Sequence, residues 1–129
     1  MPAEIVTAEE VPLPSGPFAS ATLATGARIL SVSGQIAQSK DGGLVGADDA
    51  GEQARQCLRN VDALLRAAGA ARTDVVRVVV YLTDMADRAA VARAREEYFG
   101  DHRPAATLVE IRALVAPQFK VEIEATAVF

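Results

Sequence analysis

The sequence predicts a single domain of the α+β class, and three observations lead to this prediction. Apolar and polar residues alternate over residues 120–128, which is the period of a strand with two different faces. Apolar residues recur three and four apart over 49–69 and 84–99, which is the period of an amphipathic helix. The whole chain, 1–129, is half hydrophobic, so we expect one domain with a real core.

The first part of the chain is predicted to be extended. Segment 12–22 is rich in proline and is expected to form an ordered loop or an edge segment. Segment 28–37 is predicted to be a strand that breaks at Gly34. A loop with an Asp-Gly turn signal follows it at 39–46.

The clearest predicted helix covers residues 49–69. Asp49, followed by Glu52, resembles a capping box, and Gly69 is expected to end the helix. Cys57 lies in the middle of the apolar stripe of this helix. We therefore expect Cys57 to be a small buried hydrophobic residue rather than a reactive thiol.

The second half of the chain should contain three strands and a second helix. Residues 74–83 are rich in β-branched side chains and should form a buried strand, and 105–114 and 120–128 should form two more. Asp84 can cap the second helix, and Gly100 can end it. The inner stripe of this helix is expected to contain Ala90, Val91, Ala94 and Tyr98. The expected order of elements is therefore β-β-α-β-α-β-β.

Two helices are too few to cover both faces of this sheet, so we expect both on one face of a mixed sheet. Pairing the last two predicted strands by their alternation assigns the side chains to two faces. The face beneath the helices should hold Thr107, Val109, Ile111, Val121, Ile123 and Ala125. The opposite face should hold Ala106, Leu108, Glu110, Arg112, Glu122 and Glu124. That mixture favours an interface between copies of the chain with a polar cleft; a solvated antiparallel face is the alternative.

Composition and charge argue against several classes of function. The net charge is −4 and the pI is about 5.0, so a nucleic acid is not an expected partner. No apolar run reaches the roughly 18 residues of a membrane span. The lone Cys57 excludes an internal disulfide, and we expect a cytoplasmic protein. The chain has one cysteine and one histidine, and these provide no pair with metal-ligand spacing. His102 is expected to be a surface residue, and a general-base role is the alternative.

Several segments together resemble the RidA/YjgF (Rid) family. The resemblance runs from about residue 10 to 129 and is carried by SGPFASAT, SVSGQIA, ARQCLRNVDALLRAAG, VVRVVVYLTDM and RPAATLVEI with FKVEIEATAV. It implies a chorismate-mutase-like α+β fold and a homotrimer whose sheets form a central barrel, with clefts between the subunits. It also implies hydrolysis of reactive enamines or imines, such as 2-aminoacrylate, to a 2-keto acid and ammonia, without a metal or an organic cofactor.

The resemblance also implies roles for individual positions. Glu122 falls on the family's water-positioning glutamate, and Ser33 is the serine of the SGQ motif. Glu122 and Ser33 are therefore the expected catalytic residues. The expected substrate-binding positions are Phe18, Gln35, Ala106 and Leu108.

The chain departs from the family pattern at three of these positions. Phe18 keeps the ring of the usual tyrosine but lacks its hydroxyl. Ala106 stands where an arginine normally grips the substrate carboxylate, and Leu108 replaces a small thiol or hydroxyl residue. Losing the two parallel bonds of an arginine typically costs on the order of 10²-fold in rate. Neither Arg103 nor Arg112 is well placed to replace it.

Three functions remain open at this point. The first is an enzyme that hydrates a small enamine, imine or related metabolite, with Glu122 acting through one water and with weak or absent activity toward ordinary 2-imino acids. The second is a non-catalytic trimer that binds a small metabolite or a protein. The third is an endoribonuclease, against which the acidic pI argues. Structural roles are also open, because Glu122 can pair with Arg28 or Arg112 and Gln35 can satisfy backbone groups.

Overall fold

The computed structural model describes residues 3–10, 12–14 and 16–129. In chain order its strands are β1 (Glu4–Val6), β2 (Ala21–Leu23), β3 (Ile29–Gln35), β4 (Val75–Leu82), β5 (Ala105–Glu110) and β6 (Val121–Val128). The α-helices are α1 (Ala50–Ala67), between β3 and β4, and α2 (Arg88–Phe99), between β4 and β5. Two short 3-10 helices, Arg72–Asp74 and Met85–Asp87, precede β4 and α2.

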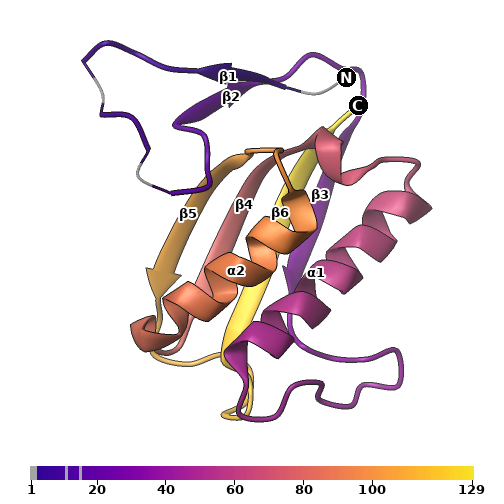
Figure 1. Cartoon of the computed structure of the whole chain (residues 1–129). Coiled ribbons are helices and arrows are strands. Elements are labelled where there is room, and N and C mark those ends of the chain that lie inside the picture. Colours follow the sequence, from indigo (N-terminus) through magenta and orange to yellow (C-terminus); the bar gives the residue numbers. More distant parts are fainter. Residues whose placement is uncertain (1–2, 11, 15) are drawn as a thin grey trace.

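The main sheet has four strands in the order β3-β6-β4-β5. Strand β6 runs antiparallel to β3 and β4, whereas β4 and β5 are parallel, so the sheet is mixed. Both helices lie on one face of this sheet, as Figure 1 shows. The predicted α+β class, with two helices on one face of a mixed sheet, is therefore confirmed.

A separate two-stranded ribbon precedes the main sheet. Strands β1 and β2 pair antiparallel, at the top of the view in Figure 1. The hydroxyl of Thr22 donates a hydrogen bond to Val76 O at 2.9 Å, which ties the ribbon to β4. The predicted order lacked β1. Its three residues are all exposed, so no burial pattern marks them as a strand.

Helix α1 begins and ends close to the predicted positions. Asp49 Oδ1 accepts a hydrogen bond from Glu52 N at 3.0 Å, which makes Asp49 the expected N-cap. Gly69 follows the last turn with a φ of 84°, a left-handed conformation that glycine adopts without steric cost. The sequence signals at both ends of the helix are therefore confirmed.

Gln53 is fully buried on α1 and connects the helix to two loops. Its Nε2 donates to Gly46 O at 3.1 Å and to Gln118 O at 3.0 Å. Its Oε1 accepts from Lys120 N at 2.8 Å. Because both polar atoms of the side chain are bonded, Gln53 can be buried without an unsatisfied group. These bonds fix the segment that leads into β6.

Helix α2 follows a short 3-10 turn. Asp84 accepts a hydrogen bond from Ala86 N at 2.9 Å, so it caps the 3-10 helix Met85–Asp87 and not α2 itself. Gly100 ends α2 with a φ of 60°. The buried residues of α2 are Val91, Ala94, Arg95 and Phe99. Within the described residues, no helix is both long and apolar enough to cross a membrane.

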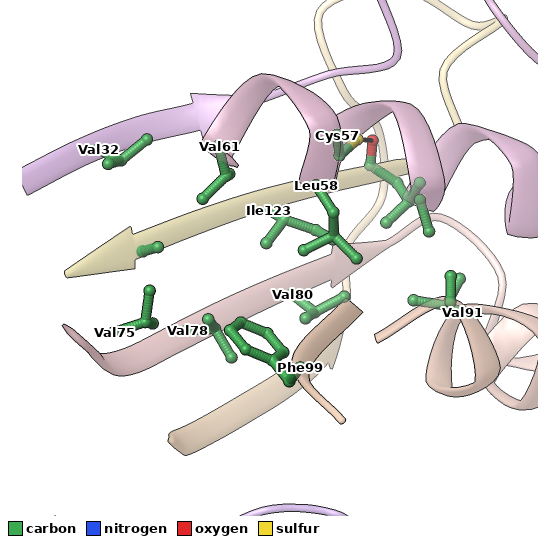
Figure 2. Close-up of a cluster of buried hydrophobic side chains, with 14 of the residues drawn as sticks. Val32, Cys57, Leu58, Val61, Val75, Val78, Val80, Val91, Phe99 and Ile123 are labelled. Atoms are coloured by element: carbon green, nitrogen blue, oxygen red, sulfur yellow. Dashed lines mark hydrogen bonds between the residues drawn. The ribbon is translucent and has the colours of Figure 1, made fainter. Parts of the chain in front are cut away.

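The hydrophobic core lies between the helices and the covered face of the sheet (Figure 2). Strand β6 contributes Val121, Ile123, Ala125 and Ala127, which are at most 4% exposed, as the alternation predicted. From α1, Leu58 and Val61 pack against this face. Burying a side chain such as Ile123 stabilises the fold by roughly 1.5–3 kcal/mol.

The prediction for the strand at 105–114 was wrong in its length, its neighbour and its facing. Strand β5 ends at Glu110 and pairs with β4, not with β6. In this pairing Ala106 lies opposite Val78 and Leu108 lies opposite Val80, and both valines are buried beneath the helices. Ala106 and Leu108 therefore face the helix side of the sheet. No residue of β5 is fully buried, so its alternation alone does not mark the covered face.

The open face of the sheet carries a mixed set of side chains. Thr107 and Val109 lie on this face and not beneath the helices, as their pairing with β4 requires. The other residues of the open face are Ile29, Ser31, Ser33, Arg77, Val79, Tyr81, Ala105, Glu122, Glu124, Thr126 and Val128. Ile29 is 73% exposed, so part of the apolar surface of this face is uncovered in the single chain.

Candidate functional site

The predicted site residues fall into two groups in one chain. One group lines a pocket of about 370 Å³ and consists of Phe18, Ala106 and Leu108. The other group lies on β6 and at the end of β3 and consists of Glu122, Ser33 and Gln35. A single chain therefore brings together the members of each group, but it places the two groups on different parts of its surface.

Strand β5 and the loop before β2 form one wall of the pocket. Ala106 and Leu108 project from β5 on the helix side and are partly buried. The loop is held against β5 because Ala19 N donates to Pro104 O at 3.1 Å. Next to this anchor, the ring of Phe18 lines the pocket. The wall is therefore predominantly apolar.

Helix α2 forms the opposite wall. Arg88, Ala92 and Arg95 line the pocket, and their spacings of four and three residues place them on one face of the helix. None of the described residues that line the pocket is acidic. The pocket thus combines an apolar wall with two guanidinium groups from α2.

Arg95 was missed by the sequence reasoning. It is only 7% exposed, and its Nε has no hydrogen-bond partner among the described residues. None of the ion pairs in the described part of the chain includes it. Burial lowers the pKa of Arg95 from its usual value, because the charged form is disfavoured away from water. Arg95 follows Val91 by four residues, and this helical spacing is the signal that predicts an inward-facing side chain.

Glu122 is held against the backbone of β3. The register between β3 and β6 shifts between Val32 and Gln35, so β3 contains one extra residue and forms a β-bulge. At this bulge a Cβ atom on Gly34 would lie 2.7 Å from Cδ and 2.9 Å from Cγ of Glu122. Only glycine therefore fits beneath the carboxylate in its present position. The predicted break at Gly34 is this bulge.

A second carboxylate lies on the same face of β6. Glu124 Oε1 accepts a hydrogen bond from the hydroxyl of Tyr81 on β4. This bond raises the pKa of the Tyr81 hydroxyl from its usual value, because the carboxylate favours the protonated phenol. Among the described residues Glu122 forms no ion pair. Arg28, its predicted alternative partner, lies over the ring of Phe129 at 4.8 Å from the centroid.

Gln35 and Cys57 have structural contacts near Glu122. Gln35 Nε2 donates to Ser33 O at 2.9 Å, which is the backbone role that the sequence left open for it. The thiol of Cys57 donates to Val121 O at 3.7 Å. Burial raises the pKa of the Cys57 thiol to about 12, so the thiol stays protonated at neutral pH. The prediction that Cys57 is a buried hydrophobic residue is confirmed.

The charged residues before β5 do not enter the pocket. Arg103 Nη1 donates to Gly100 O and, at 3.3 Å, to His102 O, so it is held at the end of α2. His102 Nε2 donates to Val75 O at 2.7 Å, and the ring is partly buried rather than a plain surface group as predicted. Among the described residues no three His, Cys, Asp or Glu side chains are placed to hold a metal ion.

The chain is similar to known proteins over nearly its whole length. The family profile described as Endoribonuclease L-PSP matches residues 8–129. A RutC family protein of Pyrococcus horikoshii is 39% identical over 124 residues, which cover 96% of each chain. The 3-aminoacrylate deaminase RutC of Acinetobacter baylyi is 35% identical over 127 residues, which cover 98% of each chain. The crystal structure of YyfB, a Rid protein of unknown function from Yersinia pestis, matches with a TM-score of 0.90 at 34% identity, and the match covers 100% of both chains.

Two helices on one face of a mixed sheet, together with this structural match, define the class as an α+β protein of the Rid type. The chain belongs to the Rid/YjgF family, as the resemblance implied. Within that family a relative at 35% identity is named as a deaminase, and the family profile is named as an endoribonuclease. These two names describe different reactions, so the residues of the site must decide between them.

Proposed function

We propose that this chain forms a homotrimer that binds a small enamine or imine metabolite between its protomers and hydrolyses it without a cofactor. The observation that carries the proposal is the separation of the two groups of site residues. The pocket with Phe18 and Ala106 lies on the helix side of β5, whereas Glu122 lies on the open face of β6. A complete site needs the pocket of one copy to meet Glu122 of another.

The open face of the sheet supports such an assembly. Ile29 and Val109 are 73% and 37% exposed on this face, which also carries the carboxylates of Glu122 and Glu124. In addition, β3 and β5 are edge strands of the sheet. Copies that close around an axis would cover the apolar residues and shield strand edges, with the sheets forming a central barrel.

The side chains on the open face support hydrolysis. Glu122 can act as acid or base through one water, and the exposed Ser33 can bind a polar group of the substrate. The name of one relative, a 3-aminoacrylate deaminase, supports an enamine as the substrate class. The net charge of −4 argues against the endoribonuclease reaction that names the family profile.

We expect ordinary 2-imino acids to be turned over weakly or not at all. Ala106 cannot form the two parallel charge-assisted bonds that an arginine at this position would form with a carboxylate. The double variant Ala106→Arg, Leu108→Ser should therefore raise the rate on the order of 10²-fold. The assay follows the decay of 2-aminoacrylate, generated in situ by a dehydratase, by its ultraviolet absorbance.

Ala89→Arg is the matched control for this experiment, because Ala89 is exposed on α2 and does not line the pocket. It adds the same charge and should leave the rate unchanged. A wild-type chain that already consumes 2-aminoacrylate at the rate of the double variant would contradict the role given to Ala106.

A non-catalytic binding trimer is the second candidate. The observation that favours it is the apolar wall formed by Ala106 and Leu108, which lacks the expected carboxylate receptor. The variant Glu122→Gln separates the two candidates, because it removes the acid-base group and keeps the size of the side chain. Loss of all turnover in this variant supports the enzyme, and a wild-type chain that binds but never turns over any enamine supports the binding protein.

A further inference from the structure

The pocket contains a buried cation that has no partner among the described residues. Charged side chains are almost never fully buried unless they are paired, because removal from water disfavours the charge. Arg95 is 7% exposed, forms no ion pair with a described residue, and has no hydrogen-bond partner for its Nε among them. Arginine stays protonated at physiological pH, so Arg95 remains charged although it is buried. The burial of Arg95 therefore points to an anion that is not part of the chain.

The surroundings of Arg95 fit a small anion with an apolar body. Arg88 precedes Arg95 by about two helical turns on the same face of α2 and adds a second positive charge to the pocket. Phe18 and Leu108 supply the apolar surface of the pocket. A volume of about 370 Å³ is at the lower end of the range for small-molecule sites.

We propose that Arg95 is the anion receptor of this pocket and that its ligand is a small organic acid, with the carboxylate on the guanidinium and the apolar body against Phe18 and Leu108. The proposal deepens the proposed function and rests on it for the turnover of the acid, but binding of the acid can be tested without turnover. In this proposal a residue of α2 binds the carboxylate of the ligand, whereas an arginine at position 106 would bind it from β5.

This geometry has a consequence for specificity. Arg95 would bind the carboxylate from the wall formed by α2. The wall formed by β5 has no charged side chain at this point, because position 106 is an alanine. The acid is therefore bound in a different orientation from one that is gripped at position 106. Because of this different orientation, the pocket can bind carboxylates and still turn over ordinary 2-imino acids poorly.

The test compares an acid with its neutral counterpart. The probes are 2-oxobutanoate and 2-oxobutanamide, titrated into isotope-labelled protein and followed by NMR chemical shifts. The wild-type chain should bind the acid roughly tenfold or more tightly than the amide, because charge-assisted bidentate bonds form only with the carboxylate. Arg95→Met should bind both probes equally weakly, and Arg95→Lys should keep part of the preference because it keeps the charge.

Arg93→Met is the matched control, since Arg93 is exposed on the same helix and does not line the pocket. It should keep the wild-type preference for the acid. A purely structural Arg95 makes a different set of predictions: Arg95→Met would then lower the melting temperature and leave the preference for the acid intact. With our assignment, Arg95→Met removes an uncompensated buried charge and should leave the melting temperature unchanged or raise it.

Three results overturn the assignment: equal binding of acid and amide by the wild-type chain, a preference for the acid that survives Arg95→Met, and tighter binding of inorganic phosphate than of the acid. Glu122→Gln separates this inference from the proposed function. It should abolish turnover and leave the preference for the acid intact. If the preference fails while Glu122→Gln still abolishes turnover, only the assignment of Arg95 is wrong.

Discussion

Gly34 decides where the Glu122 carboxylate can lie. The β-bulge of β3 places the Cα of Gly34 directly beneath the side chain of Glu122, with no room for a Cβ. The position of the expected acid-base group therefore depends on a neighbour that has no side chain. This is a steric requirement and not a conformational one, because Gly34 does not adopt a left-handed φ.

The variant Gly34→Ala should displace Glu122. The added methyl group would overlap Cγ and Cδ of Glu122, but this flexible side chain can rotate away, so the free energy of unfolding should fall by no more than about 1 kcal/mol. Because the carboxylate must move, turnover should fall about tenfold or more. Urea unfolding at fixed protein concentration and a rate assay measure the two effects.

Gly43→Ala is the matched control for this variant, because a Cβ there would lie 3.7 Å from its nearest neighbour, Ser39 Oγ. It should change neither stability nor rate. The double variant Gly34→Ala, Glu122→Ala removes the clash and should recover the stability that Gly34→Ala loses. If the double variant remains as unstable as the single one, contact with Glu122 is not the reason for Gly34.

The sequence predicted the position of some site residues and not of others. The facing of Glu122 followed from strict alternation with Val121 and Ile123, which are both fully buried. Arg95 was not predicted, because an arginine within a charged helix is normally solvated and its inward position depends on the packing of α2. The spacing of four residues between Val91 and Arg95 indicates that Arg95 faces inward. Only the structure shows that this inward face borders a pocket.

At the scale of elements, α1 depends on a single polar side chain in its buried face. Gln53 bonds the loop before α1 and the segment before β6 through Gly46 O, Gln118 O and Lys120 N. Gly46 lies about 70 residues before Gln118 and Lys120 in the sequence, and the amide of Gln53 bonds both segments. The position of β6, and with it the position of Glu122, follows from these bonds.

The variant Gln53→Leu should lower the free energy of unfolding by about 2–4 kcal/mol. Leucine has a similar volume but leaves buried backbone groups without partners, and each such group costs about 1–3 kcal/mol. Gln118→Leu is the matched control, because the Gln118 side chain is exposed. Urea denaturation followed by circular dichroism compares the two, and equal stability of both variants would contradict the role of Gln53.

Helices and strands that local sequence patterns mark could be predicted. The pairing of neighbouring strands in the sheet could not. The cap at Asp49 and the glycine at Gly69 defined α1 closely, and the helical and strand periods gave the class of the fold. The facing of β5 failed because it is set by the pairing of Ala106 with Val78. Pairing partners are a property of the whole sheet, and an edge strand with no fully buried residue does not reveal them.

At the scale of the whole molecule, one chain presents an incomplete site. The helix side offers a pocket with Arg95, which forms no ion pair with a described residue, and the open side offers Glu122 on a partly apolar sheet face. In the proposed function each surface supplies what the other lacks: a receptor for an anion on one, and an acid-base group for water on the other. The proposed function therefore requires the association of identical chains.

Sedimentation equilibrium of the chain 1–129 tests this claim most directly. We predict a single species with three times the 13.5 kDa mass of one chain at micromolar concentration, because in the proposed homotrimer three copies close the sheets and complete the clefts. A species of 13.5 kDa across the same range of concentrations would contradict the account, since the pocket and Glu122 would then never meet.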